Sequence, residues 1–144
     1  MDSTYYKTMA LDLGERRIGI ALSDVMGIIA SGLETYERKD IISDCKYIAG
    51  LVAKHGVKEI VVGLPKNMDG TSGERVEKTY EFCEKLKEYT QEKIVYYDER
   101  LTTVAAEKLL ISADVSRQKR KTVIDKLAAT IILQDYLNLN QRGK

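Results

Sequence analysis

The stretch that decides the fold is residues 8–23, TMALDLGERRIGIALS. It contains two short apolar runs, Thr8–Leu13 and Ile18–Ser23, separated by the polar residues GERR at 14–17. Apolar runs of this length, joined by a short turn that contains glycine, are typical of a β-hairpin. We therefore expect the chain to open with two antiparallel strands.

Downstream of this hairpin, strand and helix patterns alternate. Leu33–Glu37 alternates like a strand with one wet face, and the β-branched runs Glu59–Gly63 and Ile94–Tyr97 are typical of buried strands. A helix is predicted at 41–55, with Asp40 as its N-cap and Gly56 just after its end. A second helix is predicted to start at a capping box of Thr71 and Glu74 and to end near Thr90. Two further helices are predicted at 103–111 and 122–137, with a basic loop, Ser112–Lys121, between them.

This order of elements predicts an α/β fold. Three strands followed by alternating helices and strands indicate a five-stranded mixed sheet with helices on both faces. The first three strands are expected to be antiparallel, and helical crossovers make the later pairings parallel. Because no linker, repeat or low-complexity segment divides the chain, we expect a single domain over residues 1–144.

The composition excludes several classes of protein. The 144 residues carry 23 Lys and Arg against 22 Asp and Glu, so any nucleic-acid surface must be a local patch. Cys45 and Cys83 are too few for a disulfide framework and lack the spacing of a zinc site, so we expect reduced core cysteines. With neither a signal peptide nor an apolar run of about 18 residues, the sequence predicts a soluble cytoplasmic protein.

Four acidic residues are candidates for a site: three lie at the carboxyl ends of predicted strands, where α/β sheets bind ligands, and one lies in the last helix. Asp12 ends the first predicted strand, Asp98 and Glu99 end the fifth, and Asp125 lies beside the apolar positions of the last helix. A buried carboxylate costs several kcal/mol unless it is paired or binds a metal. Converging carboxylates without histidine or thiolate ligands favour a hard divalent cation, Mg²⁺ or Mn²⁺. Such a site could hydrolyse a phosphodiester without a histidine base.

A structural interpretation of the same acids stays open. Asp12 could pair with an arginine of the turn, Asp98 and Glu99 could cap the following helix, and Asp125 could stabilise a helix N-terminus.

Four motifs, taken together, resemble one family, the YqgF (RuvX-like) proteins. They are residues 12–24, DLGERRIGIALSD; residues 63–70, GLPKNMDG; residues 98–103, DERLTT; and residues 123–129, VIDKLAA. They occur in the family's order and span nearly the whole chain. The chain differs from related patterns in carrying Gly63, where many RNase H-like nucleases have an acid, and Lys126, where a small residue is common.

The resemblance implies an RNase H-like fold and a metal-dependent nuclease. It implies that Asp12, Glu99 and Asp125 are catalytic residues and ligands of Mg²⁺ or Mn²⁺, with Asp98 as a possible further ligand. The substrate expected first is the 5′ end of precursor 16S rRNA, which would make the protein a factor in ribosome biogenesis. Branched DNA of the Holliday-junction type is the alternative. The protein could act as a monomer or, on a junction, as a homodimer.

Basic residues close to the acids are candidates for binding the nucleic acid. They are Arg16, Arg17, Lys66, Arg100, Arg117, Lys119, Arg120 and Lys121. Around an acidic centre they would supply the positive charge that holds a phosphodiester backbone. The run from Arg117 to Lys121 could equally be a solvated loop, and Lys126 could contact a phosphate or only water.

Two other classes of function remain as alternatives. An aspartate and glycine before a hairpin also resemble the phosphate loop of sugar-kinase and actin-like ATPases, which need two such domains. A non-catalytic RNA-binding protein with the same fold is the other alternative, and retention of all three acids argues against it.

Overall fold

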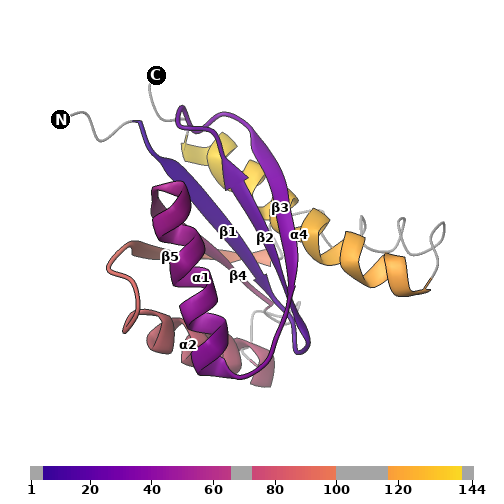
Figure 1. Cartoon of the computed structure of the whole chain (residues 1–144). Helices are drawn as coiled ribbons and strands as arrows, with labels where there is room; N and C mark the ends of the chain where they lie inside the picture. The colour runs from indigo at the N-terminus through magenta and orange to yellow at the C-terminus, as the bar shows by residue number, and fades with distance from the viewer. Residues whose placement is uncertain (1–4, 66–72, 100–116, 141–144) are drawn as a thin grey trace.

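The computed structural model describes residues 5–65, 73–99 and 117–140, without the side chains of 117–125. The elements are, in chain order, β1 (Lys7–Leu13), β2 (Arg17–Ser23), β3 (Ala30–Glu37), α1 (Ile41–His55), β4 (Val57–Leu64), α2 (Glu74–Leu86), β5 (Lys93–Asp98) and α4 (Arg117–Asn140). The strands form one five-stranded sheet in the order β3-β2-β1-β4-β5 (Figure 1).

The pairing of the strands confirms the predicted fold class. β1 is antiparallel to β2, and β2 is antiparallel to β3. β1 is parallel to β4, and β4 is parallel to β5. The first strand therefore lies at the centre of the sheet, as expected for a hairpin that is extended on one side by β3 and on the other by helical crossovers.

Helices cover both faces of the sheet (Figure 1). On one face α1 and α2 pack against large side chains of β1, Met9 and Leu11 among them. On the other face α4 packs against Ala10 and Ala21 through its own small residues, which include Ala128. Successive residues of a strand point to opposite faces, so β1 serves both cores at once. The small side chains let α4 approach closely to the strands that it crosses.

The ends of α1 follow the local sequence as predicted. The Asp40 side chain accepts a hydrogen bond of 2.8 Å from the Ser43 amide, which makes Asp40 the N-cap. Gly56 ends the helix with φ of 66°, a left-handed conformation that favours glycine. The two predicted core cysteines are also buried and free of disulfides.

The predicted boundaries of α2 are wrong at both ends. Its N-cap is Gly73, without a side-chain hydrogen bond, so Glu74 is the first helical residue and cannot complete a capping box. The helix ends at Leu86, because the amides of Glu88 and Tyr89 bond to carbonyls three residues back instead of four. Thr71 lies outside the described residues.

The predicted basic loop is wrong for residues 117–121. α4 begins at Arg117, so these residues form its first turns. Arginine, lysine and glutamine are good helix formers, and the run contains neither glycine nor proline. The rest of that loop, 112–116, and the predicted helix at 103–111 lie outside the described residues.

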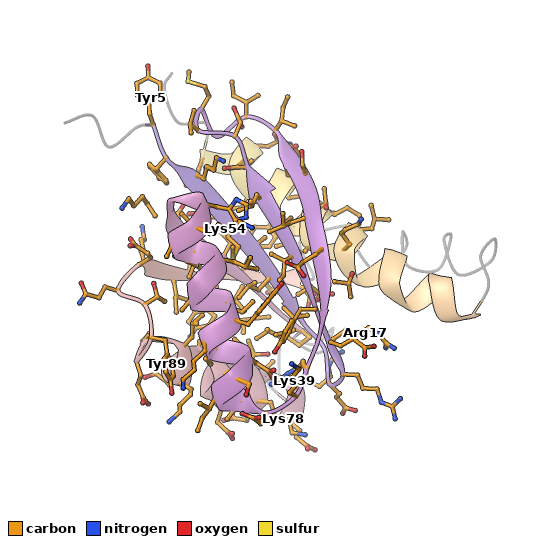
Figure 2. The ribbon with its side chains drawn as sticks, viewed as in Figure 1. Tyr5, Arg17, Lys39, Lys54, Lys78 and Tyr89 are labelled. Atoms are coloured by element: carbon orange, nitrogen blue, oxygen red, sulfur yellow. The ribbon has the colours of Figure 1, made fainter. Side chains whose placement is uncertain are left out.

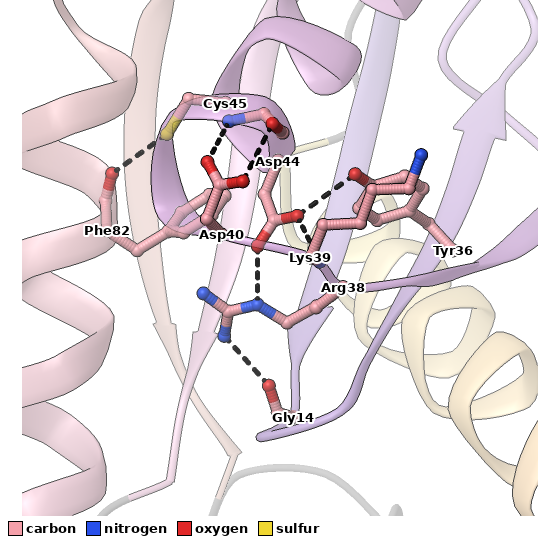
Figure 3. A network of polar contacts seen from close by, with 9 residues as sticks. Gly14, Tyr36, Arg38, Lys39, Asp40, Asp44, Cys45 and Phe82 are labelled. Atoms are coloured by element: carbon pink, nitrogen blue, oxygen red, sulfur yellow. Dashed lines mark hydrogen bonds and ion pairs between the residues drawn. The ribbon is translucent and has the colours of Figure 1, made fainter.

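A buried ion pair holds the turn that follows β1 (Figure 3). The Asp44 carboxylate, only 1% exposed, lies 2.9 Å from Nε of Arg38 and accepts hydrogen bonds from the Tyr36 hydroxyl and the Lys39 amide. Arg38 also donates to the Gly14 carbonyl at 2.9 Å. Burial, and then the bond to Asp44, raise the pKa of Tyr36 to about 12. The turn is thereby fixed to the start of α1.

Replacing Arg38 should therefore destabilise the fold far more than replacing an arginine whose acidic partner is exposed. Arg38→Met leaves the buried Asp44 charge without its cation, and we expect a loss of about 3 kcal/mol in the free energy of unfolding. Arg17→Met is the matched control, because Arg17 pairs at 3.4 Å with Glu37, which is 78% exposed, and should cost less than about 1 kcal/mol. Urea denaturation measures both, and equal losses would contradict this role of Arg38.

Candidate active site

Asp12 occupies the most sheltered position of the candidate site. It lies near the end of the central strand β1 and is 5% exposed. Because Ala10 packs against α4, strand alternation places Asp12 on the same face. Its partner in β2 is Gly19. The β1–β4 pairing of Leu11 with Val62, continued by one residue, places Gly63 on the other side.

Glycines therefore flank Asp12 on both neighbouring strands. Residues paired across a sheet share a face, so a side chain at either position would stand next to the carboxylate. Because neither glycine has a side chain, there is room beside Asp12 for side chains from other elements.

Glu99 enters this room from the end of β5. It is half-buried, and its Cγ and Cδ atoms lie 3.1 and 3.3 Å from the position that a Cβ on Gly63 would take. Because β4 lies between β5 and β1, a Glu99 side chain that lies over Gly63 of β4 is on the side of β5 that faces β1. The structure thus brings Asp12 and Glu99 to one face of the sheet, on either side of Gly63.

Asp98 differs from its neighbour Glu99 in the face that it occupies. Asp98 is the last residue of β5 and follows Tyr97, which packs against α4. Strand alternation therefore places Asp98 on the opposite face from Asp12. Of the two adjacent acids, Glu99 is the one that shares a face with Asp12.

Asp125 lies in α4, within the first half of the helix. It precedes Ala128 and Ala129, both buried against the sheet, by three and four residues. Its side chain is outside the described part of the structure. Among the described residues, no group of three or more His, Cys, Asp or Glu side chains is arranged to hold a metal.

Only some of the basic candidates lie in the part of the chain that the structure describes. Arg16 and Arg17 lie at the turn between β1 and β2, beside the end of β1 that carries Asp12. Lys66 and Arg100 lie outside the described residues. The four basic residues of the predicted loop belong to α4, and their side chains lie outside the described part: Arg117, Lys119, Arg120 and Lys121.

A groove of about 700 Å³ lies beside this turn, and its lining mixes both charges. It includes Arg16, Arg17, Lys39 and Lys78 (the last three are labelled in Figure 2). Arg17 is paired with Glu37, and Lys78 is paired with Glu74 at 3.2 Å. Within the part of the chain that the structure describes, neither Arg16 nor Lys39 takes part in an ion pair. These two cations are the ones available to a phosphate.

The stem of Lys126 rests on the edge strand β3. Its Cγ and Cδ lie 2.6 and 2.9 Å from the position of a Cβ on Gly32. The side chain starts out over β3, two strands away from β1 in the sheet.

Sequence reasoning missed two contributions to the site. Arg38 anchors the turn after β1, and Gly63 provides the surface on which Glu99 lies. Arg38 carried no signal, because its partners Asp44 and Gly14 are separated from it in sequence. Gly63 was noted only as a departure from an acidic pattern.

Two solved structures have folds similar to that of this chain. The structure resembles that of T. thermophilus RuvC bound to a Holliday junction substrate, with a TM-score of 0.59 and 10% identity over 96% of this chain and 98% of that one. It also resembles the fowlpox virus Holliday junction resolvase, with a TM-score of 0.52 and 11% identity over 92% and 99%. These similarities establish the RNase H-like fold that the motifs implied.

The family follows from the sequence itself. Residues 6–139 match the family described as "RuvX: Holliday junction resolvase", and the chain belongs to that family. A protein of Halalkalibacterium halodurans is 54% identical over 94% of this chain and 98% of its own length, and one of Halothermothrix orenii is 52% identical over 94% and 97%. Both are named "Putative pre-16S rRNA nuclease". The predicted family is confirmed, and the predicted enzyme class, nuclease, is the one that these names give.

The described helices also bear on membrane insertion. None of those in residues 5–65, 73–99 and 117–140 is long and apolar enough to cross a membrane.

Proposed function

We propose that this protein is a divalent-metal-dependent nuclease that trims the 5′ end of precursor 16S rRNA. The observation that carries the proposal is that Glu99 lies over Gly63, on the face of the sheet to which strand alternation assigns the nearly buried Asp12. The substrate rests on the names of relatives about half identical over nearly their whole length.

The residues fit a hard cation. Asp12 is nearly buried, and a second carboxylate beside it would repel it unless a positive charge intervened. Carboxylate oxygens are the ligands that Mg²⁺ and Mn²⁺ prefer. We propose Asp12 and Glu99 as ligands and Asp125 of α4 as the third. A cation bound there would polarise the scissile phosphate and lower the pKa of a bound water.

The chain's own residues then have separate tasks. Asp12 belongs to the central strand and Glu99 directly follows β5, so the sheet would position both carboxylates for the cation. Arg16, at the turn beside Asp12, would bind a backbone phosphate and orient the strand. Asp98, on the other face of the sheet, is not part of this proposed ligand set.

The start of α4 supplies a further reason to expect a polyanion. Arg117, Lys119, Arg120 and Lys121 occupy its first turns, and its first turn contains no acid. The N-terminus of a helix is itself positive, so clustered cations there are unfavourable without an anion. A nucleic-acid backbone at this end would offset both sources of charge.

Asp12→Asn tests the proposed chemistry. The amide keeps the size of the side chain but loses the charge that attracts the cation. We expect cleavage of a precursor 16S rRNA carrying its 5′ extension to fall more than about 100-fold, since even supporting groups around metal ligands cost 10- to 100-fold. Single-turnover cleavage in Mg²⁺ or Mn²⁺ measures the rate. Asp24→Asn is the control, because Asp24 follows β2 at the other end of the sheet and an asparagine oxygen can still accept the Ile28 and Ile29 amides.

The outcomes separate the alternatives. An Asp12→Asn rate close to that of the wild type would contradict the metal-nuclease mechanism. Cleavage of a four-way DNA junction but not of the rRNA would replace the proposed substrate with branched DNA, the activity in the family's description. RNA binding without any cleavage would leave a non-catalytic RNA-binding protein.

Arg16→Gln tests the proposed path of the RNA. Loss of one phosphate contact should lower the slope of log affinity against log salt by roughly 0.7 for single-stranded RNA. Lys54→Gln is the matched control: it removes the same charge from the last turn of α1, next to the start of β4 and away from the end of β1 that carries Asp12 (Figure 2). Titrations at several salt concentrations in EDTA measure both slopes. Equal slopes in the two variants would place the RNA elsewhere.

A further inference from the structure

Gly63 lies beneath side chains from two other parts of the chain, Ile132 of α4 and Glu99 after β5. A Cβ at this position would stand 2.8 Å from Cδ1 of Ile132 in α4, and 3.1 and 3.3 Å from Cγ and Cδ of Glu99. Real Cβ atoms essentially never approach another heavy atom within 3.0 Å. The volume of a side chain at Gly63 is therefore already filled by Ile132 and Glu99.

The backbone does not explain the glycine. Among the described glycines, positive φ angles occur at Gly27 and Gly56, and Gly63 is part of the regular strand β4. Any residue could adopt its backbone conformation. The reason for glycine here is the space above it, which the side chains of Glu99 and Ile132 occupy.

We propose that Gly63 is a positioning residue of the site: by having no side chain, it lets Glu99 reach across β4 to the carboxylate of Asp12. The inference rests on the proposed function, because it treats Glu99 as a metal ligand. Gly63 itself touches neither metal nor substrate. Its missing side chain leaves the space that determines how closely the Glu99 carboxylate can approach that of Asp12.

An added methyl group at Gly63 has two ways to be accommodated. Cδ1 of Ile132 is the end of a flexible side chain and can rotate away. Cδ of Glu99 is the carboxylate carbon and Cγ is bonded to it, so any movement there shifts the proposed ligand oxygens. An alanine should therefore weaken the binding of a cation even if the fold is intact.

The experiment compares Gly63→Ala with Gly50→Ala. Gly50 lies inside α1, and a Cβ there meets nothing within 4 Å, so this variant adds the same methyl group without a clash. Calorimetric titration with Mn²⁺ alone is the readout. We expect the Mn²⁺ affinity of Gly63→Ala to fall about tenfold or more, as for other groups that orient metal ligands, and that of Gly50→Ala to match the wild type.

A second pair of variants separates the acid from the packing. Ile132→Val removes Cδ1, the atom closest to the new methyl group, so Gly63→Ala/Ile132→Val relieves the tightest contact and guards against failure to fold. If Gly63 acts through Glu99, the double variant still binds Mn²⁺ about tenfold more weakly than Ile132→Val alone. In a Glu99→Gln background, Gly63→Ala should cause no further loss.

Three results would overturn the inference. Wild-type Mn²⁺ affinity in Gly63→Ala would show that Glu99 does not need the space. Recovery of affinity in the double variant would assign the effect to the packing of α4. A wild-type protein that binds no Mn²⁺ would contradict the proposed function and this inference together, whereas the first two results leave the proposed function standing.

Discussion

The candidate site depends on Asp12, a carboxylate that lies almost buried in the central strand of the sheet. Burying a carboxylate costs free energy, so the site needs a place from which other groups can reach it. Gly19 and Gly63 on the flanking strands leave that place, and Glu99 reaches into it. On the same face, alanines of β1, β2 and α4 let the helix that carries Asp125 approach closely. The opposite face holds the large apolar side chains that stabilise the sheet.

The two faces of β1 therefore serve different purposes. Met9 and Leu11 pack into the core beneath α1 and α2, while Ala10 and Asp12 face α4. Arg38 connects the two regions: it pairs with Asp44 of α1 and donates a hydrogen bond to Gly14, in the turn that follows Asp12. Stability and chemistry are thus carried by alternate residues of one strand.

The sequence predicted what local patterns encode. The hairpin and the caps of α1 at Asp40 and Gly56 depend on neighbouring residues, and they were predicted correctly. The start of α4 was not, because a run of basic residues has no apolar periodicity and resembles a loop in sequence. The acids were singled out, but which of Asp98 and Glu99 shares a face with Asp12 depends on strand phase. The role of Gly63 depends on a side chain from another strand, which no local pattern reports.

The anomalous difference density of Mn²⁺ in crystals of the wild-type protein would show directly whether Asp12 and Glu99 share a cation. We expect a peak within coordination distance of both Asp12 and Glu99, on the face of the sheet that α4 covers. Asp98 should make no contact with it. A fully occupied Mn²⁺ bound to Asp98 instead of Glu99, or no peak beside Asp12 at saturating Mn²⁺, would show that these two acids do not form the metal site.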